Sequence, residues 1–451
     1  MKKNQATVIF SLVLLLFSCK KDDDTVKVPE VEPGTVPFIF TINALYDDAR
    51  VGFYLALNTY DYNYTIDWGD GTIDENQTSS PNHFYKEKGT YKISITGELP
   101  QFFAEDFMYH DENGYNVIAL NQWGNIEWES LDSVFSECSE LINLADDIPN
   151  LKNVVSMRNM FQNATRFNAD LNDWDVSQVT NMVSAFKGAS SFNGDLNNWD
   201  VGKVTDMRNM FQNATSFNRD LNNRDVRKVT LMNNMFEGAT KFNGNIADWD
   251  LRNLQQMTSM FAGAEAFNSN ISRWNVGNVS ITARMFEDAT SFNQDISNWD
   301  MRKNGITTGM FKGATSFNQD IGNWDTSNFQ QVQYMFSEAS QFNTDIGNWN
   351  MHVADDMRNM FDGATSFDQD LGNWNLMSAD KMENMFDDSG LSTTNYDATL
   401  KGWSEQDKLK SYVILGAEGL GYCDNGETAR QILINNKGWV INGDTKSAIC
   451  N

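Results

Sequence analysis

The chain has 451 residues, 41% of them hydrophobic, which is enough apolar material to build a large buried core. Its formal net charge of −27 argues against a nucleic-acid partner, because binding to nucleic acid requires a basic surface. The acidity is typical of a highly soluble chain, and the alternative is an acidic face that selects cationic or calcium-bridged partners.

The N-terminus predicts a signal peptide. Two lysines precede an apolar run over residues 8–17, which is too short to cross a bilayer, and the run leads into Leu-Phe-Ser-Cys at residues 16–19. This ending resembles the lipobox of bacterial lipoproteins. The resemblance implies a lipoprotein signal peptide over residues 1–18, lipidation of Cys19 and a membrane anchor made by that lipid. A cleaved signal peptide with a chance cysteine is the alternative.

Residues 19–36 are predicted to form a tether. The charged run Lys-Lys-Asp-Asp-Asp at residues 20–24 resembles the surface-export signal of Bacteroidota-type lipoproteins. The resemblance implies an outer-membrane lipoprotein that is exposed at the cell surface. Pro29, Pro33 and Gly34 then favour an extended segment.

Residues 37–98 are predicted to form a small antiparallel β-sandwich, because short apolar runs alternate there with turn residues. The segment Ile-Asp-Trp-Gly-Asp-Gly-Thr at residues 66–72 resembles the signature of PKD-like domains, which implies a spacer or adhesion module. Asp67 and Asp70 are interpreted as turn-stabilising residues, since Asp-Gly pairs favour tight turns. Metal ligation by these two residues is the alternative.

The region 151–390 repeats every 25 residues. One phenylalanine column runs from Phe161 to Phe386 without a slip, and a tryptophan column runs from Trp174 to Trp374 with Arg224 as its one departure. A fixed period of this length marks a solenoid, in which stacked turns share one core.

Each repeat is predicted to contain a strand and a helical turn. The apolar spacing over residues 171–179 fits the L-x-x-L-x-L pattern of leucine-rich repeats, and the alternation over 174–176 predicts one short strand. Val179, Met182 and Phe186 then fall at helical spacing. The predicted fold class is therefore mainly a leucine-rich-repeat solenoid, with a short parallel strand and a short helical turn per 25-residue repeat, preceded by the small all-β PKD-like sandwich.

The repeat also matches a known bacterial consensus. Residues 285–300 read Met-Phe-Glu-Asp-Ala-Thr-Ser-Phe-Asn-Gln-Asp-Ile-Ser-Asn-Trp-Asp, which resembles the MFxxATSFNxDIxNWDVS repeats of BspA-type leucine-rich repeat surface proteins. The similarity covers roughly residues 120 to 451. It implies adhesion to host matrix proteins and to other cells.

Most repeated columns are interpreted as scaffold. Asparagines from Asn168 to Asn343 are expected to bond the turn backbone, and the tryptophans are expected in the core rather than as sugar-stacking platforms. An outward column of aspartates and asparagines, from Asp175 to Asn375, places like charges close together. Lysines, ions or shifted pKa values should relieve that repulsion.

One outward column varies from repeat to repeat, and variation on a constant scaffold is where a repeat protein can encode its choice of partner. Tolerated surface drift is the alternative. The candidate partner-binding face consists of Ser177, Arg227, Arg252, Arg302, Ser327, His352 and Met377.

The two ends of the repeat region are predicted to be caps, residues 99–150 before it and residues 391–451 after it, because exposed core at an end must be covered. Cys138 takes the position of the repeat's small alanine and is interpreted as a buried core residue. Cys423 and Cys450 form a candidate disulfide, since both lie in the short C-terminal region of an exported chain.

No catalytic or metal-binding motif stands out in the sequence. The 3 histidines lack the spacing of a metal site, and the carboxylates are periodic, so no pair is singled out for acid–base chemistry. We therefore expect a protein that is not an enzyme and that has no cofactor and no catalytic or structural metal. Calcium in the acidic ladder is the open alternative.

The predicted function is that of a monomeric, surface-anchored adhesion or protein-binding module whose partner is an extracellular protein. The alternative is a glycan-binding surface lipoprotein, with tryptophans or tyrosines as stacking platforms. Burial of the tryptophan column separates the two, because a buried indole cannot stack on a sugar.

Overall fold

The computed structural model describes residues 32–103, 114–448 and 450. The predicted signal peptide, Cys19 and most of the predicted tether lie outside these residues. Pro33–Asn451 forms one compact unit. None of the helices in the described part of the chain is long and apolar enough to cross a membrane.

The first part of this unit contains two antiparallel sheets. A five-stranded sheet has the order β4-β3-β6-β1-β7, and a second sheet pairs β2 with β5. The strands are β1 (Phe38–Ala44), β2 (Ala49–Gly52), β3 (Asn63–Asp67), β4 (Ile73–Gln77), β5 (Asn82–Tyr85), β6 (Gly89–Glu98) and β7 (Tyr115–Gln122).

Alternation gives the larger sheet a buried face. Phe38, Phe40 and Ile42 on β1 are buried, while the residues between them are partly exposed. β7 lies in the range predicted as a cap, and it pairs with β1. A parallel bridge from Ala119 on β7 to Asn143 joins this sheet to the segment that leads into the repeats.

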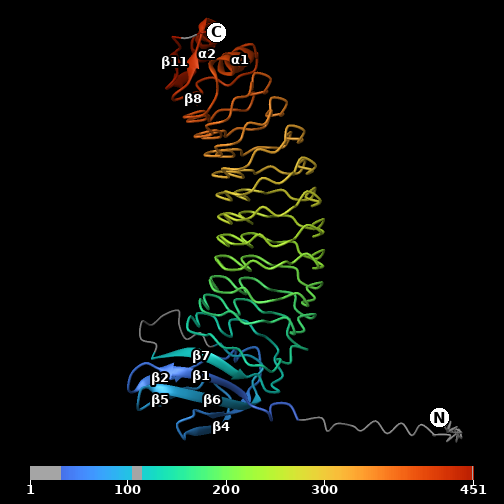
Figure 1. The fold of residues 1–451 in the computed structure, drawn as a ribbon, viewed down its shortest axis with the longest axis vertical. Coiled ribbons are helices and arrows are strands. Elements are labelled where there is room, and N and C mark those ends of the chain that lie inside the picture. The colour runs from blue at the N-terminus through green and yellow to red at the C-terminus, as the bar shows by residue number, and fades with distance from the viewer. Residues whose placement is uncertain (1–31, 104–113, 449, 451) are drawn as a thin grey trace, which may run out of the picture. The chain divides into compact units, whose positions relative to one another are not determined.

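From residue 156 to residue 381 the chain winds in coils of 25 residues, stacked one upon the next (Figure 1). One residue of each coil forms a parallel bridge to its equivalent in the next, as Asn181 does with Asp206. Further backbone bonds link the coils; the Phe186 N–H donates to Met210 O at 2.9 Å. Each coil thus satisfies much of its backbone through its two neighbours.

The predicted leucine-rich-repeat solenoid is wrong, because the repeats contain neither the strand nor the helical turn expected of them. Within the described residues the only helices are α1 (Thr393–Ser404) and α2 (Asp424–Lys437), which follow the last repeat. No strand forms over residues 174–176. The Ser177 N–H donates instead to Asp175 Oδ1 at 3.1 Å, and this bond closes a turn.

Left-handed residues explain why the helical spacing does not produce a helix. Each coil carries two residues with positive φ, four positions apart, such as Asn159 and Asn163, both at φ 54°. A left-handed residue interrupts a right-handed helix, so the segment is a run of short turns; the Met160 N–H donates to Met157 O at 3.3 Å. The apolar residues at helical spacing still face the core, and Phe186 is fully buried.

A single hydrophobic core runs through the β-sheet region, the coils and the C-terminal region. Phenylalanine rings of successive coils stack, as Phe186 does on Phe211 with 5.5 Å between ring centroids and 4° between ring planes. Within a coil the two phenylalanine columns also stack, and the centroids of Phe186 and Phe192 lie 4.2 Å apart. Ring stacking adds to the burial of apolar area, so these columns hold each coil to its neighbours.

The tryptophan column is buried, with between 0% and 5% of each residue exposed. The indole N–H groups reach carbonyls of the preceding coil: Trp199 Nε1 donates to Leu171 O at 2.8 Å, and Trp249 Nε1 donates to Leu221 O at 2.8 Å. Tryptophan suits this position because its ring fills the core while its N–H satisfies a buried acceptor.

The C-terminal region covers the last coil. Its strands are β8 (Ile414–Gly416), β9 (Gly421–Tyr422), β10 (Val440–Asn442) and β11 (Thr445–Lys446), paired in parallel as β8 with β10 and β9 with β11. A parallel bridge joins Met382 of the last coil to Leu415 of β8. Trp403 of α1 continues the tryptophan column, because its Nε1 donates to Leu371 O at 2.9 Å and its ring stacks on Phe386.

Arg224 stands in the tryptophan column and leaves it incomplete. Its Nη1 donates to Asn197 O at 2.7 Å and to Trp199 O at 2.8 Å, and its Nη2 donates to Leu196 O. Burial lowers the pKa of this guanidinium, because desolvation disfavours the charged form. An apolar cavity of about 20 Å³ remains beside it, lined in part by Trp199 and Trp249.

We predict that Arg224→Trp stabilises the protein by about 1–2 kcal/mol, because an indole fills the cavity and its N–H can bond the Leu196 carbonyl. Calorimetry should show a melting temperature raised by roughly 1–4 °C. Arg273→Trp is the control, since the Arg273 side chain is 80% exposed and should give no gain. An unchanged or lower melting temperature for Arg224→Trp would show that the incomplete tryptophan column does not weaken this coil.

Candidate functional site

The predicted partner-binding face, here called the variable column, follows one edge of the coils. Each residue donates its backbone N–H to an aspartate or asparagine two positions earlier, so the column lies on a turn and not on the predicted strand. Four of its residues are exposed: Arg227, Arg252, Arg302 and Met377. The other three, Ser177, Ser327 and His352, are partly exposed. The structure brings all seven to equivalent positions of the stack.

The three arginines of the variable column form ion pairs with aspartates of their own coils. Arg227 Nη2 lies 2.7 Å from Asp225 Oδ2, and its Nε donates to Oδ1 at 2.8 Å. This two-bond geometry fixes the guanidinium while 62% to 69% of each arginine side chain stays exposed. The pairs are Arg227 with Asp225, Arg252 with Asp250 and Arg302 with Asp300.

These bonds favour the ionised form of the aspartates. The hydrogen bond from Arg227 lowers the pKa of Asp225 to about 2, and the other two arginines lower the pKa of Asp250 and of Asp300 in the same way. A serine hydroxyl lowers the pKa of Asp175. Like-charge repulsion along the aspartate column is therefore offset inside each of these coils.

We predict that the Asp225 carboxylate titrates near pH 2 in the folded protein and that Arg227→Met raises its pKa toward 3.8. Because the folded pKa lies below the ordinary value, stabilisation by this pair is fully present above about pH 4 and is lost as the pH falls toward 2. A carbon-detected NMR titration of the carboxyl groups measures both effects. As a control, Arg302→Met should move Asp300 and leave Asp225 unchanged; an Asp225 titration that ignores Arg227→Met would refute the pairing.

The constant columns use their polar groups in bonds between coils. The Asn193 N–H donates to Asn168 Oδ1 at 2.7 Å, and the same bond recurs along the asparagine column. Hydroxyl groups of another column do likewise, as Thr215 Oγ1 donates to Ser190 O at 3.2 Å. These side chains are therefore scaffold and leave the variable column as the candidate for recognition.

In the β-sheet region the two aspartates of the predicted turn bond their own loop. The Gly69 N–H donates to Asp67 Oδ1 and the Thr72 N–H to Asp70 Oδ1, each at 2.9 Å. The second oxygen of Asp70 lies 2.8 Å from His83 Nε2. Among the described residues, no group of three or more histidine, cysteine, aspartate or glutamate side chains is arranged to hold a metal ion.

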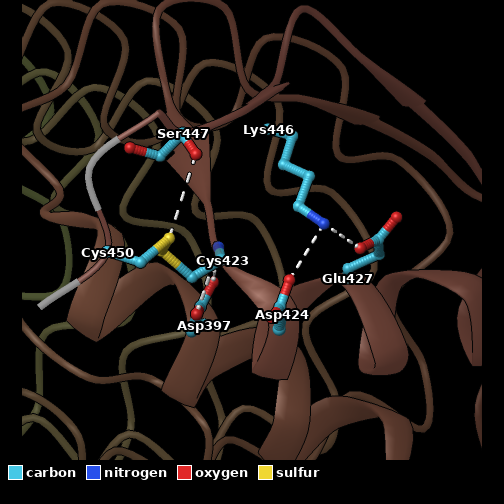
Figure 2. Close-up of a disulfide and its surroundings, with 7 residues drawn as sticks. All are labelled: Asp397, Cys423, Asp424, Glu427, Lys446, Ser447 and Cys450. Carbon is cyan, nitrogen blue, oxygen red and sulfur yellow. Dashed lines mark hydrogen bonds and ion pairs between the residues drawn. A yellow bond between two sulfur atoms is a disulfide. The ribbon is translucent and has the colours of Figure 1, made fainter.

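Cys423 and Cys450, the candidate disulfide pair, are joined through their sulfur atoms, with their Cα atoms 5.8 Å apart (Figure 2). The Cys423 N–H donates to Asp397 Oδ1 at 3.0 Å, which ties the start of α2 to α1. Lys446 Nζ lies 2.9 Å from Asp424 Oδ1 beside the same disulfide (Figure 2). These contacts fasten the end of the chain to the C-terminal helices. Cys138 is buried in the core.

We predict that Cys450→Ser destabilises the C-terminal region by roughly 3–4 kcal/mol, because the cross-link spans a sequence separation of 27 residues. Amide hydrogen exchange in α2 and β11 measures the loss of protection. Dithiothreitol should cause the same loss in the wild type and no further loss in Cys450→Ser. Unchanged protection after reduction would show that the disulfide contributes nothing.

The sequence did not single out the first left-handed position of each coil, where Arg284 and Tyr334 are exposed. The first left-handed residue of each coil is asparagine, serine or glycine except at Arg284, with φ 57°, and Tyr334, with φ 60°. Gly309 occupies the same position in the coil between them. One feature of the sequence marks this position: two long side chains stand in a column whose other members are small or amide residues, which accept positive φ more readily.

Comparison with known families matches the chain to a family model. The model described as "Mycoplasma protein of unknown function, DUF285" matches residues 129–230, 219–308 and 305–403, which together cover the coils and more than half of the chain. None of the curated proteins compared with the chain matches it.

Proposed function

The chain belongs to the DUF285 family, and we propose that this member is a surface-anchored module that binds an extracellular protein along its stacked coils. Cys19 would carry the lipid that anchors it to the outer membrane, as the likeness of its N-terminus to a lipobox suggests. The likeness of the repeats to those of BspA-type surface proteins supports the adhesive role, and the likeness of residues 66–72 to PKD-like domains supports a spacer before the coils.

The observation that carries the proposal is that constant positions of each coil have a structural role while one exposed position varies. Phenylalanine, tryptophan and asparagine recur at fixed positions and are committed to the core or to bonds between coils. The variable column changes from coil to coil on that constant frame, and its arginines are largely exposed although each is held by an aspartate. Side chains that are both exposed and held in place lose little entropy on binding, which favours specific docking.

The tryptophans weigh against the glycan-binding alternative in its simplest form. A stacking platform must present an open ring face, and every tryptophan of the column is at least 95% buried with its N–H bonded in the cases described above. The exposed tyrosines Tyr334 and Tyr412 are not members of the variable column: Tyr334 stands at a left-handed position of its coil, and Tyr412 lies between α1 and β8. A protein partner therefore fits the exposed surface better than a sugar does.

The test is a binding assay with the full chain in detergent against immobilised extracellular matrix proteins and a glycan array. We expect saturable binding to a protein, weakened at least tenfold by the double variant Arg227→Ser with Arg252→Ser. Serine is chosen because Ser177 and Ser327 occupy the same column. Saturable binding to glycans alone would overturn the proposal, and so would the absence of saturable binding to any matrix protein or glycan.

The chain offers a matched control for that variant. Arg208 and Arg358 also pair with aspartates two residues earlier, at 2.7 Å and 2.6 Å, but at a different position of the coil. The double variant Arg208→Ser with Arg358→Ser removes the same charge and the same kind of ion pair. Affinity should stay within twofold of the wild type, and an equal loss in both double variants would mean that binding depends on net charge and not on the variable column.

A further inference from the structure

We propose that Arg227 and Arg252 hold a carboxylate of an acidic segment of the partner protein between their guanidinium groups. The two arginines are neighbours in the variable column, one 25-residue coil apart. The inference rests on the proposed function and deepens it, because it names the chemistry by which the partner is recognised. Three features carry it: free donors on both guanidinium groups, the closeness of the two groups, and a local excess of positive charge.

Each of the two guanidinium groups keeps free donors after it has bonded its own aspartate. Arg227 donates from Nε and Nη2 to Asp225, and no described residue accepts a bond from its Nη1. Arg252 bonds Asp250 through the same two atoms, and its Nη1 is equally free among the described residues. A guanidinium has more N–H groups than this pairing uses. With 63% and 62% of their side chains exposed, both arginines can therefore donate to a carboxylate from outside.

The two guanidinium groups lie close enough to repel each other. Because both arginines pair with their aspartates through the same atoms, their guanidinium groups are stacked at the spacing of the coils, about 4.8 Å. The pKa of Arg252 is raised, mainly by its hydrogen bond to Asp250, and the positive charge of Arg227 opposes that rise. A carboxylate between the two groups would relieve the repulsion and would accept a hydrogen bond from each.

Arg227 lies in the most basic coil of the repeats. Residues 204–228 include five basic and three acidic residues, whereas each of the other coils between residues 154 and 378, divided at the same place, has at least as many acidic as basic residues. Lys228 follows Arg227 directly and makes no ion pair with any described residue. Lys203, at the equivalent position of the preceding coil, donates from Nζ to the neutral side chain of Gln178 at 2.6 Å. Charges more than about 8 Å away are largely screened at physiological ionic strength, so an incoming carboxylate responds to these cations rather than to the net charge of −27.

Arg302 provides a comparison within the same column. It pairs with Asp300 through the same atoms, and 69% of its side chain is exposed. The equivalent position is glycine in the preceding coil, at Gly277, and serine in the next, at Ser327. Arg302 therefore has no second guanidinium beside it in the column, and we expect it to hold a carboxylate less tightly than the two neighbouring arginines do.

The test is isothermal titration calorimetry on the full chain in detergent at low ionic strength. The probe is a synthetic hexapeptide of alternating glycine and glutamate, capped at both ends. The same peptide with glutamine in place of glutamate is the neutral comparison, and a heparin hexasaccharide is the sulfated-glycan comparison. We expect the acidic peptide to bind the wild type more tightly than either comparison does, and added salt to weaken that binding. Arg227→Gln and Arg252→Gln should each weaken it roughly fivefold, as expected for the loss of one exposed charge pair.

Arg302→Gln is the matched control. It removes the same charge from the same kind of ion pair, and in all three variants one aspartate loses its arginine. Any effect of that unpaired aspartate on the fold is therefore equal in each, and the melting temperature of each variant shows that it is folded. The acidic peptide should bind Arg302→Gln within about twofold of the wild type, because a solitary exposed ion pair contributes little.

Any of four results would overturn the inference: no binding of the acidic peptide, equally tight binding of the neutral peptide, an equal loss in Arg302→Gln, or tighter binding of the heparin hexasaccharide. The matrix-protein assay separates this inference from the proposed function. If a matrix protein binds and an excess of the acidic peptide does not displace it, the inference fails while the proposed function stands. If the acidic peptide binds as expected but no matrix protein does, the proposed function fails while the two arginines remain a site for a carboxylate.

Discussion

The coils depend on one constraint: after 25 residues the backbone must return to a place from which its N–H groups reach the carbonyls of the next coil. The bond from the Phe186 N–H to Met210 O belongs to this ladder. Because the ladder fixes the register, each side chain meets its own equivalent in the next coil. Phenylalanine stacks on phenylalanine and asparagine bonds asparagine for that reason. A single inserted residue must bulge out of its coil, or it shifts the side chains that follow it in that coil away from their partners.

The sequence was sufficient to find the period and to assign columns to the core, because burial repeats as regularly as the residues do. It was misleading about secondary structure. The helical spacing of Val179, Met182 and Phe186 records which side chains face inward, and a run of turns can satisfy that spacing as well as a helix can. Asparagine, serine and glycine recurring four positions apart, as at Ser184 and Gly188, carried the missing information, since asparagine and glycine in particular accept positive φ.

The variable column and the pair Arg284 and Tyr334 differ in how far the sequence alone reveals them. The variable column is visible in the repeat alignment as the outward position that changes, although its contact with an aspartate two residues earlier appears only in the folded turn. Arg284 and Tyr334 lie two repeats apart, and stacking of the coils is what places them on either side of Gly309. The core position that the sequence predicted for the tryptophans is confirmed, because every indole of the column is buried.

The register of the coils has a consequence for how such a gene can change. Each coil bonds to the one before and the one after in the same way, while β7 also pairs with β1 and α1 is also tied to the start of α2, contacts that no coil makes. Unequal recombination can duplicate or remove a whole coil. The coils that then become neighbours make the same contacts that any two neighbouring coils make, and both ends stay intact. The length of the binding surface can therefore evolve by one coil at a time, without any change in the two end regions. An in-frame insertion or deletion of any other length would break the register of the hydrogen bonds between coils.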